Sequence, residues 1–207
     1  MKDFTERLIV YSSDDDASAV AVWGVDWATV PPRDRPIDLT IPSEIDGRRV
    51  VKIEEGAFSY LEALRSVAIP ATVRAVGVAA FRYCRSLTTI AFAEGLESIN
   101  HHAFSCCPLL TSVALPQSLN RLGDAAFSYC RALREVSLPE GVRRIGESEF
   151  KGCCSLRTIV LPTTVRSIAP DAFSNCPLDL TIVAQPETYA ALWARKNRVR
   201  LKARPEL

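Results

Sequence analysis

The sequence predicts a right-handed solenoid of about seven coils, each 23 residues long and built mainly from short parallel strands. The first observation is a phenylalanine that recurs every 23 residues through most of the 207-residue chain. The second is that rows of leucine, isoleucine, valine and cysteine keep the same spacing. One such coil cannot bury its apolar residues alone, so the coils must stack with like residues above one another. The phenylalanine row is Phe58, Phe81, Phe104, Phe127, Phe150 and Phe173.

Each coil divides into three segments. Residues 133–138 alternate inward and outward side chains and predict a first strand, which Pro139 ends because proline cannot donate to a strand ladder. Residues 142–146 predict a second extended segment with a glycine at its corner. The pattern Ala-Phe-x-x-Cys then predicts one turn of helix or 3₁₀ helix with Phe and Cys pointing inward. Glu149 is the one polar residue in the row that precedes the phenylalanines.

These rows resemble the repeat of one known family. The pattern L-x-x-I-x-L-P-x-x-V-x-x-I-G-x-x-A-F-x-x-C is almost complete in residues 87–107 and 133–153. It resembles the BspA-like, or Treponema-type, leucine-rich repeat family, and the resemblance covers about residues 39–185. The resemblance implies a leucine-rich-repeat solenoid of the α/β horseshoe class. It also implies attachment to host or bacterial surface proteins.

The ends of the chain lack the repeat, as the ends of a solenoid must. We expect an N-terminal β cap over residues 1–40, in which residues 20–27 form a strand that pairs with residues 8–11 in a hairpin. The repeats follow over residues 41–185 as one continuous domain. The first repeat is lengthened by a five-residue turn around Asp46-Gly47.

Residues 186–207 predict a C-terminal cap made of a helix and a strand. The helix should cover residues 186–197 and pack through Tyr189, Leu192 and Trp193. After it, Val199 and Leu201 alternate with basic residues, which indicates a final edge strand. Lys and Arg on such a strand discourage edge-to-edge aggregation, and this explains them better than an acidic partner does.

Composition excludes some classes of function. The net charge is +1, which argues against bulk attraction to nucleic acid or to an anionic membrane. Residues 1–16 contain no apolar run long enough for a secretory leader, and no run in the chain could span a membrane. The sequence as it stands predicts a cytoplasmic protein, and a cell-surface or secreted one if a leader has been removed. We expect a monomer.

The seven cysteines follow the repeat and do not indicate a disulfide framework. Five of them form an inward row, where free cysteine acts as a small buried hydrophobe. Cys106 and Cys154 fall outside this row and are the candidates for reactivity. The cluster of His101, His102, Cys106 and Cys107 lacks metal-site spacing, so we expect neither a metal nor a cofactor. The row is Cys84, Cys107, Cys130, Cys153 and Cys176.

The outward rows of the first strands are the candidate partner-binding face. They combine small residues that admit a partner's backbone with arginine, which is favoured at interfaces. Simple β-propensity on a wet face explains the same composition equally well. Tyr60, Tyr83 and Tyr129 form another row, either a half-buried edge or an aromatic contact strip. The candidate residues are Arg65, Ser66, Thr88, Thr89, Thr111, Ser112, Arg134, Glu135, Arg157 and Thr158.

Two functions remain open. No nucleophile–base pair, phosphate-binding glycine loop or paired-carboxylate motif occurs, so we expect a protein that is not an enzyme. The first hypothesis is a scaffold that binds another protein, with adhesion implied by the family resemblance. The alternative is a carbohydrate or cell-surface polymer module that uses the tyrosine row or the Ser/Thr rows.

Overall fold

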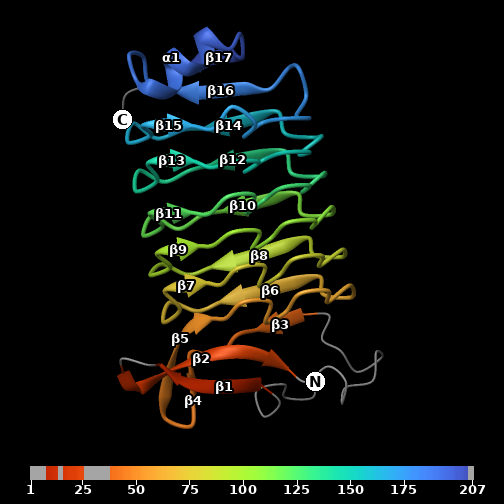
Figure 1. The fold of residues 1–207 in the computed structure, drawn as a ribbon, viewed down its shortest axis with the longest axis vertical. Coiled ribbons are helices and arrows are strands. Elements are labelled where there is room, and N and C mark those ends of the chain that lie inside the picture. Colours follow the sequence, from red (N-terminus) through yellow and green to blue (C-terminus); the bar gives the residue numbers. More distant parts are fainter. Residues whose placement is uncertain (1–7, 14–15, 26–37, 205–207) are drawn as a thin grey trace.

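The computed structural model describes residues 8–13, 16–25 and 38–204, and these form a solenoid as the repeat predicts. Coils stack along the long axis, with the N-terminal strands at one end and the only helix of the described part at the other (Figure 1). The first strand of each coil lies on one side of the stack. These strands are β3 (Asp38–Thr40), β6 (Ser66–Ile69), β8 (Thr89–Phe92), β10 (Ser112–Ala114), β12 (Glu135–Ser137), β14 (Thr158–Val160) and β16 (Thr181–Ala184).

The second extended segments form the other sheet side. Most neighbouring coils pair in parallel, so each paired residue lies opposite its equivalent in the next repeat: Val67 opposite Ile90, and Val136 opposite Ile159. No ladder joins β8 to β10, where the first-strand side divides into two sheets. The inward residue of each pair is buried, which confirms the predicted core rows. The second strands are β5 (Arg48–Ile53), β7 (Ala75–Val76), β9 (Ser98–Ile99), β11 (Arg121–Leu122), β13 (Arg144–Ile145) and β15 (Ser167–Ile168).

The third side differs from the expected helical turn. Residues around the first five phenylalanines of the row form successive tight turns, because residues two before and two after each of them have positive φ, as at Ala79 (52°) and Tyr83 (60°). A right-handed helix needs negative φ at consecutive residues, so no helix forms here. The alternation instead turns the backbone amides toward the next coil: the N–H of Phe81 donates to Ala103 O at 2.8 Å.

The phenylalanine and cysteine rows fill the core behind these turns. Successive rings stack with centroids 5.3–6.1 Å apart, and such aromatic pairs contribute about 0.5–1.5 kcal/mol each. Each row cysteine donates its S–H to a phenylalanine carbonyl of the preceding coil, as Cys130 Sγ does to Phe104 O at 3.3 Å. The cysteine therefore fills a small space and also satisfies a buried acceptor, which alanine could not do.

Glu149 departs from this apolar core. Its side chain is fully buried, and neither carboxylate oxygen has a hydrogen-bond partner of good geometry. Burial raises the pKa of Glu149 well above its ordinary value, and the charge of Asp124 raises it further. The neighbouring positions in this row, Ala126 and Ala172, are buried alanines. An unpaired polar group in such a place destabilises the folded state.

The N-terminal end forms the expected hairpin, in which β1 (Leu8–Ser13) pairs antiparallel with β2 (Asp16–Val25). β2 then pairs in parallel with β5 and so caps the second sheet. The lengthened first repeat contains a short strand, β4 (Glu44–Ile45), which folds back on β5. Its turn is Asp46-Gly47, and both residues have positive φ, as a tight hairpin turn requires.

The C-terminal cap consists of α1 (Tyr189–Lys196) and β17 (Arg200–Ala203), and β17 extends the first sheet beyond β16. The predicted packing face of the helix was partly wrong, because Tyr189 and Leu192 are exposed. Ala190, Ala191 and Ala194 are buried instead, so small side chains let the helix approach the last coil closely. Trp193 does pack against the core, edge-on to Phe173. No described helix is long and apolar enough to cross a bilayer.

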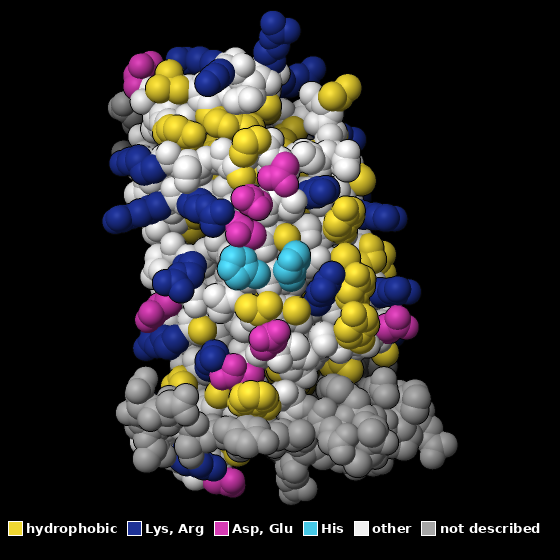
Figure 2. All heavy atoms as spheres, in the orientation of Figure 1, with side chains coloured by type: hydrophobic (Ala, Val, Ile, Leu, Met, Phe, Trp, Pro, Cys, Tyr) yellow, Lys and Arg dark blue, Asp and Glu magenta, His cyan; other side chains and the backbone are white. Residues whose placement is uncertain are grey.

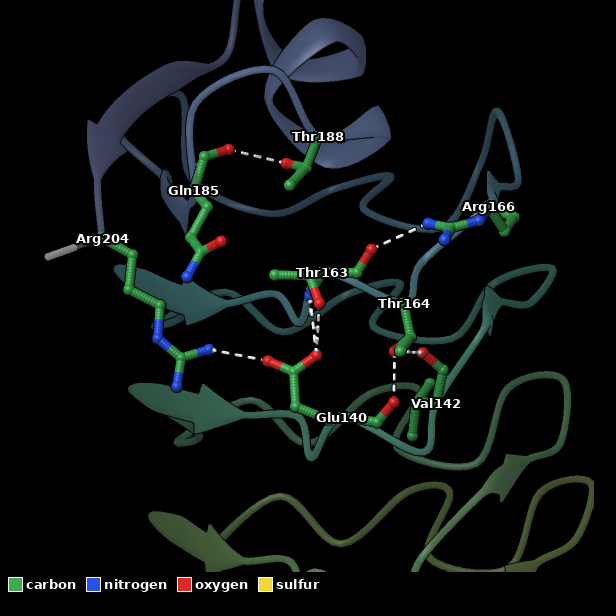
Figure 3. Close-up of polar contacts among 8 residues, drawn as sticks. All are labelled: Glu140, Val142, Thr163, Thr164, Arg166, Gln185, Thr188 and Arg204. Atoms are coloured by element: carbon green, nitrogen blue, oxygen red, sulfur yellow. Dashed lines mark hydrogen bonds and ion pairs between the residues drawn. The ribbon is translucent and has the colours of Figure 1, made fainter. Parts of the chain in front are cut away.

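Polar contacts tie this cap to the coils below it (Figure 3). The Glu140 carboxylate accepts from the N–H and the hydroxyl of Thr163 in the next coil, at 2.9 and 2.8 Å. It also pairs with Arg204 Nη1 at 3.3 Å, which links the end of β17 to a coil 64 residues earlier. Glu94 accepts from the N–H groups of Gln117 and Ser118 in the same way. A glutamate after the first strand therefore holds the corner of the coil above.

We predict that all seven cysteines titrate as free thiols in unfolded protein and that the row cysteines resist modification in folded protein. Burial raises the pKa of Cys84 to about 12 and that of Cys176 to about 11, so the reactive thiolate is scarce. Alkylation followed by mass spectrometry should find Cys106 and Cys154 modified first, because both have some exposure. Six paired cysteines would refute this account.

We predict that Glu149→Ala stabilises the protein by about 1–3 kcal/mol near pH 7, the usual cost of an unpaired buried polar group. The raised pKa means that folded protein binds the proton more tightly than unfolded chain. Wild-type stability therefore falls as pH rises above the unfolded pKa, about 4.5. Denaturation at several pH values should show the two proteins converging in acid, while exposed Glu147→Ala changes little. A less stable Glu149→Ala variant at pH 7 would contradict this prediction.

Candidate functional site

The outer face of the first sheet brings most of the predicted site residues into two neighbouring rows. Register places Ser66 beside Thr89, and it places Ser112, Glu135, Thr158 and Thr181 in one line across β10 to β16. Arg65, Thr88, Thr111, Arg134 and Arg157 each come one residue earlier in their coils and are exposed. The next outward row is Ala68, Ala91, Ala114, Ser137, Val160 and Val183.

The rows are held by contacts within the face. The hydroxyl of Thr88 donates to Arg65 O at 3.1 Å, and the hydroxyl of Ser66 donates to Asp38 Oδ1 at 2.6 Å. The strands β10, β12, β14, β16 and β17 are also joined by continuous ladders, as are β3, β6 and β8, so the side chains project from a rigid base. Rigid presentation lowers the ordering cost of binding a partner.

The arginines of this face are not evenly spread. Arg134 and Arg157 lie in adjacent coils, whereas Arg65 lies three coils from Arg134, roughly 14 Å away at the spacing of strands. Arg157 Nη1 forms an ion pair with Asp179 Oδ1 at 2.6 Å, with both side chains about half exposed. The three predicted arginines of this face therefore form two separate groups.

Sequence reasoning missed two basic residues of the same face. Because β17 pairs in parallel with β16, Arg200 lies beside Thr181 and Lys202 beside Val183. Both continue the outward rows, and both are exposed. The alternation around Val199 and Leu201 could have placed them, had the strand been assigned to this sheet and not only to an edge. The C-terminal half of the face is consequently basic, while Asp38 stands at the other end.

A second basic cluster lies on the other sheet. Arg121, Arg143 and Arg144 line a hollow of about 290 Å³ beside β11 and β13. Arg144 Nη2 pairs with Asp124 Oδ1 at 2.8 Å, and His101 Nδ1 accepts from the Asp124 N–H at 3.0 Å. The Asp124 carboxylate therefore partly neutralises this cluster. It gives a natural comparison for the outer face of the first sheet.

The histidine and cysteine cluster does not converge on one point. The two histidines are exposed at the middle of the face shown in Figure 2, whereas Cys107 points into the core and donates to Phe81 O at 3.3 Å. Burial, followed by the charges of Arg82 and His101, lowers the pKa of His102, which favours its neutral form. Within residues 8–13, 16–25 and 38–204, no group of three or more potential ligands has the arrangement of a metal site.

The tyrosine row lies at the corner that precedes the first strand. Tyr60 and Tyr83 stack with ring centroids 4.9 Å apart, and Tyr60 and Tyr129 are exposed. All three have positive φ near 60°, so each side chain leaves the coil in the same direction. The row continues the spacing of the coils, but it is interrupted at Cys106.

Comparisons with known proteins agree with this geometry. Six copies of the BspA type leucine rich repeat region match residues 51–179. The leucine-rich repeat protein of T. pallidum is 24% identical, with a TM-score of 0.72 over 96% of both chains. A leucine-rich cell surface protein of Faecalibacterium prausnitzii is 26% identical, with a TM-score of 0.74. That match covers 86% of this chain and 49% of the other, so the chain spans about half of that protein.

A leucine-rich repeat protein of Bacteroides ovatus shares the fold at 20% identity and a TM-score of 0.57, over 95% of this chain and 66% of the other. No curated protein matches the sequence. The repeat model covers well over half of the chain, and its copies coincide with the stacked coils. The chain therefore belongs to the BspA-type leucine-rich repeat family.

Proposed function

We propose that this protein is a non-enzymatic scaffold that binds another protein through the outer face of its first sheet. The observation that carries the proposal is the pair of exposed and half-exposed rows that runs in strand register from β10 to β17 and recurs across β6 and β8. Its middle is a floor of Ala and Ser side chains, too small to obstruct a partner's backbone. A flat floor of this kind suits a macromolecule better than a small ligand, which needs a concave site.

The charge of the face supports a partner with acidic side chains. Arg134, Arg157, Arg200 and Lys202 gather over the strands β12 to β17. Arginine binds carboxylates through two parallel hydrogen bonds and gives up little entropy in doing so. Because the protein as a whole has a net charge of only +1, this local charge would orient a partner more than attract it from a distance.

A role at the cell surface is part of this proposal. The support is that the F. prausnitzii relative, at 26% identity, is a leucine-rich cell surface protein. Adhesion to a host or bacterial surface protein would use the same face. Carbohydrate binding is the competing function, and it predicts a different result in the test below.

We predict that Arg134→Ala with Arg157→Ala weakens binding of a partner captured from cells by about tenfold or more, because centrally buried arginines contribute about 2 kcal/mol or more. The matched control is Arg143→Ala with Arg166→Ala, which removes two arginines on the other side of the coil. Both pairs are exposed, so both variants should stay within about 0.5 kcal/mol of wild-type stability for each substitution.

Affinity capture with all three proteins, followed by quantitative binding of the recovered protein, checks this prediction. Loss of binding only in the control variant would move the site to the second sheet. A glycan array run in parallel tests the competing function. Strong, saturable glycan binding without a protein partner would replace the proposal.

A further inference from the structure

A hollow of about 440 Å³ interrupts the tyrosine row at its middle. We call it the tyrosine slot. It lies beside the turns of three successive coils, and hydrophobic side chains gather in a strip along one edge of the stack, next to Lys and Arg (Figure 2). The slot is lined by Tyr83, Arg85, Cys106, Pro108, Tyr129 and Arg131.

The slot exists because one coil departs from its neighbours at two positions. Two residues after the phenylalanine, the coils before and after carry Tyr83 and Tyr129, whereas this coil carries Cys106. Four residues after it, the same neighbours carry arginine, and this coil carries Pro108. A large aromatic and a large cationic side chain are thus absent from one coil and present on both sides of it.

The missing side chain defines the shape of the space. Tyr83 and Tyr129 are two coils apart, roughly 9.6 Å at twice the spacing of paired strands. One flat ring in contact with a ring on each side needs about 7 Å. Cys106 has φ 60°, the same as Tyr83, so the backbone already holds the geometry from which a ring would enter. The slot therefore has room for one ring supplied from outside.

The side chains that line the slot determine which kind of ring it can bind. Arg85 and Arg131 stand on either side of the gap, and Arg82 contacts the Tyr83 ring with its Cζ 4.8 Å from the centroid. Arg85 forms a long, exposed ion pair with Glu62, at 3.6 Å, and no shorter one with the residues that the structure describes. None of the described residues that line the slot carries a carboxylate. The lining therefore offers the Tyr129 ring on one side and, on the other, a Tyr83 ring that also contacts Tyr60 and Arg82, and it is positive at its rim.

A sugar matches this lining poorly. Its hydroxyl groups need acceptors as well as donors, and arginine only donates. An aromatic ring stacks between tyrosines, and an anionic substituent on it would meet two guanidinium groups that bind phosphate or carboxylate through paired hydrogen bonds. We propose that the tyrosine slot binds a single aromatic ring that carries an anionic group. This proposal does not depend on the outer face of the first sheet.

The test measures binding of phenyl phosphate to the full protein. Binding is monitored by NMR of the tyrosine and arginine side chains. Wild type should show saturable shifts. Two control compounds should each bind at least about tenfold more weakly than phenyl phosphate. Cyclohexyl phosphate has the charge without the aromatic ring, and phenol has the ring without the charge. Equal binding of cyclohexyl phosphate, or no saturable binding of phenyl phosphate, would overturn the proposal.

The decisive variant is Cys106→Tyr, which restores the row by filling the slot from within. It should fold and melt at or above the wild-type temperature, because three other coils carry tyrosine at this position, and it should lose phenyl phosphate binding by about tenfold or more. Cys106→Ser keeps the slot open and should bind within about twofold of wild type. Undiminished binding by Cys106→Tyr would place the site elsewhere.

The double variant Arg85→Gln with Arg131→Gln tests the role of charge. It should bind phenyl phosphate no more tightly than it binds phenol. Arg121→Gln with Arg143→Gln is the matched control on the second sheet and should bind as wild type does. A result that needs no variant is protection of Cys106. Phenyl phosphate should slow alkylation of Cys106 but not of the exposed Cys154. If Cys106 is alkylated at the same rate with and without phenyl phosphate, this result contradicts the proposed site.

Discussion

Every level of this fold depends on the pairing of each coil with an equivalent coil 23 residues later. On both sheet sides most neighbouring strands pair in parallel, as Val67 with Ile90 and Arg144 with Ser167, and the ladders are absent only from β8 to β10 and from β11 to β13 among the coils described. On the third side the amides of each turn donate to carbonyls of the next coil, as Tyr83 N does to Ser105 O at 3.0 Å. Because three sides are tied in this way, a residue in one coil always meets its own equivalent in the next. Rows of like residues are the consequence, and they appear in the sequence as the 23-residue repeat.

The same constraint explains why cysteine is so regular here. The turns use many of their amide hydrogens to bind the next coil, and the phenylalanine carbonyl keeps the capacity to accept a hydrogen bond, although Phe127 O and Phe150 O also accept from the N–H of Cys130 and Cys153. The S–H of the row cysteine reaches that carbonyl from the following coil, at 3.3 Å for Cys84, Cys107, Cys130 and Cys153. A buried acceptor without a partner destabilises a fold, and for Phe58, Phe81 and Phe104 the thiol is the partner that the structure shows. The cysteine row is therefore part of the hydrogen-bond network and not an unused set of disulfide partners.

The repeat made the coils, their strands and the inward rows predictable from the sequence, because a fixed spacing leaves each residue type one place in the coil. Features that break the spacing were harder to predict. The cap helix packs through Ala190, Ala191 and Ala194, because close approach to the last coil mattered more than side-chain size. The turns replaced the expected helical segment because left-handed φ at residues such as Ala79 has no clear signature in an L-amino acid.

The candidate face was predicted in its rows but not in its extent. Arg200 and Lys202 joined it only when β17 was seen to pair with β16, since parallel addition of a strand 19 residues after Thr181 follows from no repeat. The tyrosine slot was visible in the sequence as Cys106 in a row of tyrosines. The hollow itself could be recognised only in the structure, because the stacked coils show that Cys106 and Pro108 of one coil line the same space.

The most direct test of coil pairing is the excision of residues 112–134, one whole coil, which joins Thr111 to Glu135 with every row still in register. The account predicts a shorter solenoid that unfolds cooperatively, with a lower melting temperature and a denaturant m-value reduced roughly in proportion to the length removed. Excision of residues 112–123 alone shifts every later row out of register and should abolish cooperative unfolding. If the whole-coil deletion is as unfolded as the half-coil deletion, pairing between equivalent rows is not what holds this protein together.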